Sequence, residues 1–434
     1  MDSFDSKTRQ NVDPFNGLNY ESYLALRKNV RDWENLGESG QGKDEKISLV
    51  CYNILCPETF KRCLYLYDHL VHTGLLHFAS WSKRFKSLVE ELKSFNADII
   101  CMQEVHMNCY SDFENSLKYA YDGIYRKKNF SYCHDGCAIF YRKDRFKKVF
   151  YEDVEFVVKG NKYLDYPHIG QVLVLKSRKT GGKFIVANTH LIFRSEKGDI
   201  RLGQAVRLLA SVHRLIQEKK YPKDIPFIFC GDCNSEPNSG FYRFMADSRL
   251  NIDRLTSDEV SNYDTPGNKL VDMRTIVPPQ LDITRRSIYR TFDRAESPVD
   301  RQLVTHPFHF KSVYDESIND NSKVGISTYH LRSGHPDFIF YSNSIENEAK
   351  SGTSSDSDDD IQVVYDSTQN YQPMQIVPIR RLGLPSLGNL SKLEKWPNEW
   401  VPSDHIPLVV EFELRKITGN EQNGSTAGSS NAKI

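Results

Sequence analysis

Short apolar segments recur along the chain and have the length of buried β-strands. The first, ISLVCYNIL, begins at Ile47 and contains β-branched and aromatic residues before it ends near Asn53. Similar segments occupy residues 97–105, 136–142, 170–177, 183–191, 225–232, 336–342 and 405–414. This pattern predicts a core built mainly of β-sheet.

Two longer segments have apolar residues at helical spacing. In residues 75–98 these are Phe78, Trp81, Phe85, Leu88, Val89, Leu92 and Phe95. Residues 202–217, LGQAVRLLASVHRLIQ, repeat the pattern between two predicted strands. Such amphipathic helices pack one face on a sheet. We therefore predict two packed sheets with helices outside them.

The regular pattern spans one domain, residues 46–415. The preceding residues 1–45 are polar, although residues 20–36 have a weak helical period. Within the domain, residues 251–335 and 343–372 lack a regular period and are predicted loop insertions; the second contains the run SSDSDDD. Residues 416–434 are rich in Gly, Ser and Asn and are predicted to be a disordered tail.

Polar residues stand at or just beyond the ends of several predicted strands. They are Asn53, Glu104, His190, Asp232, Asn234, Asp337, Asp404 and His405. Taken singly, each has an ordinary structural explanation as a turn former, a solvated charge or a hydrogen-bonded histidine. Together they predict a binding or catalytic site, because strand ends at one edge of a sheet layer open into the same cleft.

This set of side chains suits one kind of chemistry. Carboxylate oxygens bind hard cations such as Mg²⁺ or Mn²⁺, and substrate phosphate completes the coordination. Histidine and asparagine donate hydrogen bonds to phosphate oxygens, and a further aspartate can orient a water molecule as the nucleophile. The sequence thus predicts metal-assisted cleavage of a phosphoester.

Composition excludes several other classes of protein. The chain has 39% hydrophobic residues and no apolar run of about eighteen residues, so we expect a globular protein that does not span a membrane. Lys plus Arg and Asp plus Glu both number 57, so the chain has no overall positive charge that would attract nucleic acid. Any positively charged cleft must come from a local cluster of basic residues. Without an export signal we expect a cytoplasmic or nuclear location.

The nine cysteines are predicted to be reduced thiols, because their number is odd and the chain has no export signal. The pair Cys230 and Cys233 leaves one alternative open, a zinc or redox site that could also use Cys133 and Cys137. A thioredoxin-like pair should open a helix directly, whereas NSEPNSG follows this one. Cys230 is more simply core filling.

Seven segments, in this order, resemble the serial motifs of the endonuclease/exonuclease/phosphatase superfamily. They are YNIL, ADIICMQEV, DGCAIFYR, NTHL, CGDCNSEPNSGFY, DFIFYS and PSDHIPLVVEF. Within it they are similar to the Ccr4, Nocturnin and Angel branch, and THLIFRSEKGDIRLGQAVRLLASV is closest to the Angel type. The resemblance implies a four-layer α/β sandwich, two packed mixed β-sheets flanked by helices.

The resemblance also implies a metal site. Glu104 would be the main Mg²⁺ ligand, with Asn53 beside it. Asp404 would join them or help to bind a second ion, so that one or two ions fit, and Mn²⁺ could replace Mg²⁺.

The remaining residues would act on water and phosphate. Asp232 would orient or deprotonate the attacking water, and Asn234 would hold it together with the phosphate. His405 would stabilise charge on phosphorus, its ring fixed by Asp337, and His190 would contact the phosphate from the other side.

Two positions depart from the branch pattern. A lysine usually stands two residues before the aspartate of DGCAIF, but this chain has Cys133 there. The cation that would face the phosphate is therefore either missing or supplied by His134 or Arg142. Between Asp232 and the following asparagine, Cys233 replaces the usual Phe or Met.

Aromatic residues in the first insertion are candidates for substrate binding. Phe308, and with it Phe310 and Tyr314, could stack on RNA bases. The alternative is that these side chains pin the loop to the core.

The predicted function is Mg²⁺-dependent cleavage of RNA, first as a 3′-to-5′ exoribonuclease. The alternatives are a phosphatase for RNA 2′,3′-cyclic phosphate ends and a nucleotide phosphatase. An inactive RNA-binding relative would have lost Glu104, Asp232, Asn234 or His405, and all four are present. RNA is the expected partner, and residues 1–46 show no leucine-rich repeat that would recruit the chain to a deadenylase assembly.

Overall fold

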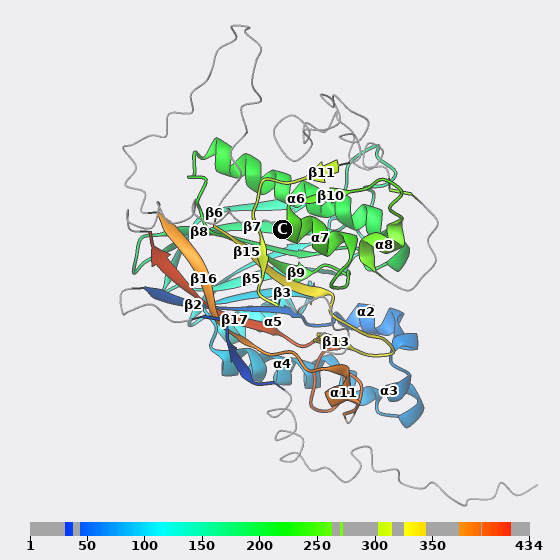
Figure 1. Cartoon of the computed structure of the whole chain (residues 1–434). Coiled ribbons are helices and arrows are strands. Elements are labelled where there is room, and N and C mark those ends of the chain that lie inside the picture. The colour runs from blue at the N-terminus through cyan, green and yellow to red at the C-terminus, as the bar shows by residue number, and fades with distance from the viewer. Residues whose placement is uncertain are drawn as a thin grey trace, which may run out of the picture.

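Two β-sheets packed face to face form the centre of the molecule, with helices on both outer sides (Figure 1). The structure is a computed structural model and describes residues 31–37, 44–262, 270–271, 303–314, 325–343, 373–391 and 393–417. In this part of the chain, no helix is both long and apolar enough to cross a membrane.

The first sheet has seven strands. In spatial order they are β1 (Trp33–Asn35), β16 (Met374–Leu382), β17 (Leu408–Lys416), β2 (Glu45–Asn53), β3 (Ile99–His106), β5 (Asp135–Arg142) and β4 (Tyr121–Lys127). Strands β2 and β3 are parallel and all other neighbours are antiparallel, so the sheet is mixed.

The second sheet has six strands. In spatial order they are β12 (Lys311–Ser312), β15 (Asp337–Ser342), β9 (Phe227–Asp232), β8 (Lys183–His190), β7 (Ile169–Ser177) and β6 (Phe146–Glu155). Here β8 and β9 are the parallel pair. Two small antiparallel pairs, β10 (Arg249–Asn251) with β11 (Leu303–Thr305) and β13 (Thr328–Tyr329) with β14 (Ser333–Gly334), lie outside both sheets.

The helices and 3₁₀ turns lie in the connections between strands. They are α2 (Pro57–Arg62), η1 (Leu64–Leu66), α3 (Asp68–Thr73), η2 (Leu76–Ala79), α4 (Trp81–Phe95), α5 (Tyr110–Leu117), η3 (Ser195–Lys197), α6 (Gly198–Glu218), α7 (Gly240–Asp247), α8 (Ser257–Ser261) and α11 (Leu387–Leu390). The two segments with the clearest helical period in the sequence are α4 and α6.

Three apolar cores separate four layers. The central core joins the inner faces of the two sheets and includes Leu49 and Ile228. Helices α4 and α5 cover the outer face of the first sheet, where Leu88 and Phe113 pack on Ile100. Helices α6 and α7 cover the second sheet. The predicted four-layer α/β sandwich is confirmed.

The segments around this core differ in detail from the prediction. Strand β1 lies inside the predicted N-terminal extension, and Trp33 pairs with Leu382. The weak helical period at residues 20–36 therefore ends in a strand, and residues 20–30 lie outside the described residues, as do 344–372 and 418–434. The first insertion contributes β11, β12, β13, β14 and α8.

Candidate active site

The direction of the strands brings the polar strand ends together. Parallel strands β8 and β9 end side by side at His190 and Asp232, which are paired in register. Strand β15 is antiparallel to β9 and begins at Asp337, directly opposite Asp232. Three residues far apart in sequence thus become neighbours at one edge of the second sheet.

Asn53 joins this edge to the first sheet. Its Nδ2 donates to Oδ2 of Asp232 at 2.9 Å and is 3.3 Å from Oε1 of Glu104. Asn53 ends β2, and β3, which carries Glu104, is parallel to it. The predicted metal ligands Asn53 and Glu104 therefore adjoin the predicted catalytic aspartate at the boundary between the two sheets.

Glu104 is placed by an irregularity in β3. The strand pairing shifts between Met102 and Val105, and Glu104 has a left-handed φ of +57°. A bulge of this kind redirects a side chain beside an active site. The backbone N–H of Cys56 donates to Oε2 of Glu104 at 2.9 Å.

The charges around Glu104 suit a bound cation. Burial, followed by the nearby carboxylates of Asp135 and Asp404, raises the pKa of Glu104 to about 7, although Lys128 opposes them. A divalent metal would relieve this repulsion, and the donors are the hard oxygens that Mg²⁺ prefers. Asp404 is held in place by the Tyr67 hydroxyl, which donates to its Oδ2 at 2.8 Å.

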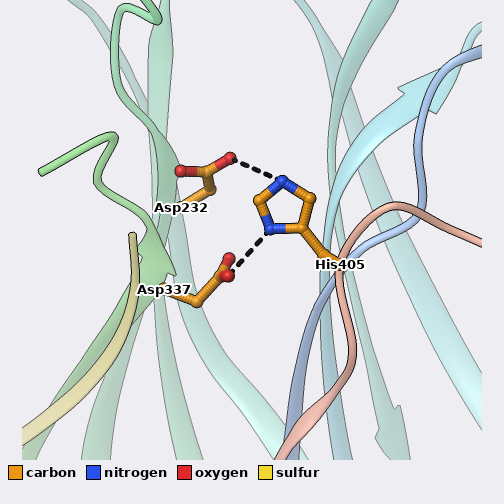
Figure 2. Close-up of side chains that lie close together, drawn as sticks. All are labelled: Asp232, Asp337 and His405. Atoms are coloured by element: carbon orange, nitrogen blue, oxygen red, sulfur yellow. Dashed lines mark hydrogen bonds and ion pairs between the residues drawn. The ribbon is translucent and has the colours of Figure 1, made fainter. Parts of the chain in front are cut away.

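His405 lies between two aspartates (Figure 2). Its Nδ1 is 2.8 Å from Oδ2 of Asp337, and its Nε2 is 3.8 Å from Oδ2 of Asp232. Burial lowers the pKa of His405, but Asp337, Asp404 and Asp232 together raise it well above the usual value. The ligand atoms of Asp232, Asp337 and His405 lie within 4.8 Å of one another, a spacing that can also hold a metal ion.

His190 has the opposite protonation behaviour. Its Nε2 lies 3.6 Å from Oδ2 of Asp232. Burial and then the charge of Lys128 lower its pKa to about 3, against the attraction of Asp232. Asp232 therefore stands between a protonated His405 and a neutral His190.

Asn234 connects two loops of the second sheet. Its φ of +48° is left-handed, which asparagine tolerates well. Its backbone N–H donates to Oδ1 of Asp232 at 3.0 Å, and its Nδ2 donates to the carbonyl of Leu191 at 2.9 Å. The side chain lies beside Asp232, as predicted, and ties the loop after His190 to the loop after Asp232.

Lys128 is a cation of the site that the sequence pattern does not predict. It is buried and forms an ion pair with Asp135 at 2.6 Å. Burial opposes the charge of Lys128, but Asp135 and Glu104 raise its pKa overall. The sequence offers no signal for it beyond the doublet Lys127–Lys128, because the pairing depends on the packing of β4 against β5.

Arg84 is a second residue beside the site that the sequence pattern does not predict. Its buried guanidinium donates to the carbonyls of Ile54 at 2.9 Å, Leu55 at 2.7 Å and Pro402 at 3.0 Å, and also to Ala79. It therefore ties the loop after Asn53 to the loop before Asp404. An arginine within an amphipathic helix pattern gives no sign of this role.

Two predicted substrate-binding residues lie elsewhere. Asp135 begins β5 and Arg142 ends it, so the two residues lie at opposite ends of the strand, about 23 Å apart by strand length. Arg142 is bonded to Asn96 and Asp144. Phe308 is only 1% exposed and packs on Phe227. The prediction that it stacks on RNA bases is therefore wrong, and the alternative, that it anchors the loop to the core, is correct.

Burial also excludes base stacking by the other two aromatic candidates, since Phe310 and Tyr314 lie in the core.

His134, by contrast, lies next to the site. It precedes Asp135, and its ring stacks on His106 at 5.9 Å. The strand ends that carry Glu104, His190 and Asp232 are here called the catalytic edge. Of His134 and Arg142, only His134 lies there.

Cys230 and Cys233 do not form a metal or redox pair. Cys230 packs in the core between the sheets, whereas Cys233 packs in the core beneath α6 and α7. The two sulfurs thus belong to opposite faces of the second sheet. The nine cysteines are all free thiols, as predicted.

Comparison with known proteins agrees with this architecture. The Endonuclease/Exonuclease/phosphatase family matches residues 52–405. Protein angel homolog 2 of Mus musculus is 30% identical over 421 residues, which cover 89% of this chain and 74% of that protein. The homologue from Homo sapiens is 29% identical over 396 residues, which cover 85% and 69%.

Solved structures give the same relationship. The crystal structure of ANGEL2, described as a 2′,3′-cyclic phosphatase, in complex with adenosine-2′,3′-vanadate has a TM-score of 0.71 and 28% identity, covering 88% of this chain and 98% of that one. The human Nocturnin catalytic domain, at 20% identity and a TM-score of 0.50, shares the fold. The chain therefore belongs to the Endonuclease/Exonuclease/phosphatase family, within its Angel-type branch.

Proposed function

We propose that this protein hydrolyses 2′,3′-cyclic phosphate at the 3′ end of RNA with the help of a divalent cation. The observation that carries the proposal is the similarity to the cyclic phosphatase ANGEL2, which extends over 98% of that structure. It favours this activity over the 3′-to-5′ exoribonuclease that the sequence first suggested. The likeness to the Nocturnin catalytic domain, at 20% identity, concerns the fold alone and supports neither of the other activities.

The residues of this chain have separate tasks in such a reaction. Burial raises the pKa of Asp232, which makes its carboxylate a stronger acceptor for the proton of an attacking water. A bond then forms between the water oxygen and phosphorus, and one of the two bonds from phosphorus to a ribose oxygen breaks. That oxygen takes up a proton from solvent, and Asp232 later releases its proton to solvent. Protonated His405 donates from Nε2 to a phosphoryl oxygen as charge develops there.

His190 and the metal site complete this arrangement. Neutral His190 can donate one hydrogen bond to the phosphate without repelling His405. Asn53, Glu104 and Asp404 would hold Mg²⁺ or Mn²⁺. When bound, the cation would neutralise charge on the phosphate oxygens.

Three substrates separate the candidate activities. Purified protein with Mg²⁺ is given a 5′-labelled RNA ending in a 2′,3′-cyclic phosphate, the same RNA with a 3′ hydroxyl, and a dinucleotide phosphate. A change in mobility of the first RNA without shortening supports the proposal. A ladder of shortened products would support the exoribonuclease instead, and release of phosphate from the dinucleotide alone would support the nucleotide phosphatase.

Variants test the assignment of residues. Asp232→Ala and His405→Ala should each abolish turnover, whereas Asp253→Ala, which changes an exposed aspartate outside the site, should not. Treatment with EDTA followed by dialysis should remove activity, and added Mg²⁺ or Mn²⁺ should restore it. Full activity in EDTA would contradict the proposed cation.

A further inference from the structure

Exposed aromatic side chains stand on three separate segments that carry or adjoin residues of the catalytic edge. Phe193 is 50% exposed, Tyr132 is 55% exposed and Tyr65 is 59% exposed. Large exposed apolar groups that gather at one place commonly mark a binding surface. None of the three takes part in the catalytic arrangement described above.

Each ring is close in sequence to a residue of the site. Phe193 follows His190 by three residues, and Tyr132 precedes Asp135 by three. Because consecutive Cα atoms are about 3.8 Å apart, the Cα atoms of Phe193 and Tyr132 each lie within about 11 Å of the Cα atom of that neighbour. Tyr65 comes two residues before Tyr67, whose hydroxyl binds Asp404.

The segment around Phe193 is firmly anchored. Nη1 of Arg201 donates to the carbonyls of Ile192 and Arg194, each at 2.7 Å, and the Arg201 side chain is fully buried. Gln204 accepts from the backbone N–H of Ile192 at 3.0 Å. The backbone on both sides of Phe193 is therefore fixed, which limits the positions that its exposed ring can take and lowers the cost of ordering it on a ligand.

An exposed arginine accompanies each ring. Arg194 follows Phe193 in the chain, and Nη2 of Arg62 donates to the carbonyl of Tyr132 at 3.3 Å. Leu331 donates from its backbone N–H to the carbonyl of Leu66, which brings the segment of Arg332 beside that of Tyr65. Rings with arginines close by suit a ligand that carries both flat apolar groups and negative charges.

We propose that Phe193, Tyr132 and Tyr65 stack on unpaired bases next to the RNA 3′ end, while Arg62, Arg194 and Arg332 contact the backbone phosphates. Bases in a duplex are covered by their neighbours, so only a single-stranded end offers faces for such stacking. The substrate is therefore an RNA with an unpaired 3′ segment. This inference rests on the proposed function in taking RNA as the ligand.

Binding measurements test the inference apart from turnover. Fluorescence anisotropy in an Asp232→Asn background compares a labelled RNA duplex with an unpaired 3′ overhang and the same RNA with the overhang paired. The overhang should bind more tightly. Phe193→Ala should weaken its binding roughly 5- to 150-fold, the range for loss of one stacked base, whereas Phe193→Trp should retain it.

Tyr119→Ala is the matched control. Tyr119 is 86% exposed, and the neighbouring Ala120 accepts from the backbone of Lys143, beyond the end of β5 that is remote from the site. This variant should bind like the parent. Arg194→Ala should lower the slope of log Kd against log salt by about 0.7, the value for one phosphate contact on a single strand.

Equal binding of paired and unpaired ends, or a Phe193→Ala variant that binds like Tyr119→Ala, overturns the inference. Binding that depends on Phe193 in a protein whose parent hydrolyses none of the three substrates overturns only the proposed function. Turnover of the cyclic phosphate with no preference for unpaired ends overturns only the inference.

Discussion

His405 and Asp337 form a hydrogen-bonded pair, with Nδ1 of the imidazole 2.8 Å from Oδ2 of the carboxylate. The Ser327 hydroxyl donates to the same oxygen at 2.6 Å. Asp337 thus receives two hydrogen bonds on the side facing the ring. The pair fixes which nitrogen of His405 faces Asp232 and keeps the ring protonated.

Replacement of the Asp337 carboxylate should change the pH dependence of catalysis. Asp337→Asn keeps the shape but removes the charge that raises the pKa of His405. Activity that needs protonated His405 is lost as pH rises through this pKa, so the alkaline limb of the kcat profile should move to lower pH. We also expect a loss of roughly 10- to 100-fold at neutral pH. An unchanged alkaline limb would contradict the role of Asp337.

Glu236 should make the protein less stable at pH 7 and above than at pH 4.5. Burial raises its pKa to about 7, well above the 4.5 of an exposed glutamate. The folded protein therefore binds this proton more tightly than the unfolded chain, and stability falls as pH rises between about 4.5 and 7.

Glu236→Gln should be more stable than the parent above pH 7, by roughly 1 to 3 kcal/mol, with no difference near pH 4.5. The glutamine can still accept from the backbone N–H of His335, which now donates to Glu236 at 2.9 Å. Urea unfolding at several pH values measures the effect. A constant difference at every pH would show that burial of this charge is not its cause.

Removal of the Arg84 guanidinium should damage both stability and catalysis. Arg84→Met leaves buried carbonyls of Ile54, Leu55 and Pro402 without their donor, at an expected cost of roughly 3 kcal/mol. Turnover should fall further than the folded fraction does, because Asn53 and Asp404 lose their common anchor. Added guanidinium ion should restore part of the turnover.

Lys86→Met is the control for this variant. Lys86 is on the same helix and is exposed, so its loss should change neither the free energy of unfolding nor kcat by much. If Arg84→Met lost activity only in proportion to its unfolded fraction, Arg84 would stabilise the fold without positioning the site.

Phe308→Ala should destabilise the protein without affecting recognition of RNA. The ring is buried against Phe227 and Phe310, so its truncation should cost about 3–5 kcal/mol in unfolding experiments. The KM of the protein that remains folded should stay unchanged. A rise in KM at constant stability would restore the stacking role that burial excludes.

Much of the fold follows from local patterns. Apolar runs and helical periods predict the principal strands and helices of the sandwich, and the polar residues at strand ends meet at one edge, as the sequence suggests. Arg142 shows where this reasoning fails. Strand β5 is antiparallel to β3, so its last residue lies at the end of the sheet opposite to Glu104. The direction in which a strand runs cannot be read from the sequence of that strand alone.

The other errors have related causes. Phe308 lies in a segment without hydrophobic period, where an aromatic residue in the core and one at a binding surface look alike. Lys128 and Arg84 act through partners distant in sequence, namely the carboxylate across a hairpin and carbonyls of two loops. Polar contacts of this kind depend on tertiary packing and produce no periodic pattern in the sequence.

The position of β17 also determines when the protein becomes active during its synthesis. This strand is the last in the described chain, yet it lies between β16 and β2 near the middle of the first sheet. His405 and Asp404 immediately precede it. A chain still emerging from the ribosome has already made Asn53, Glu104 and Asp232 but lacks Asp404 and His405 in place, so we expect no turnover of the proposed substrate before residue 416 is free.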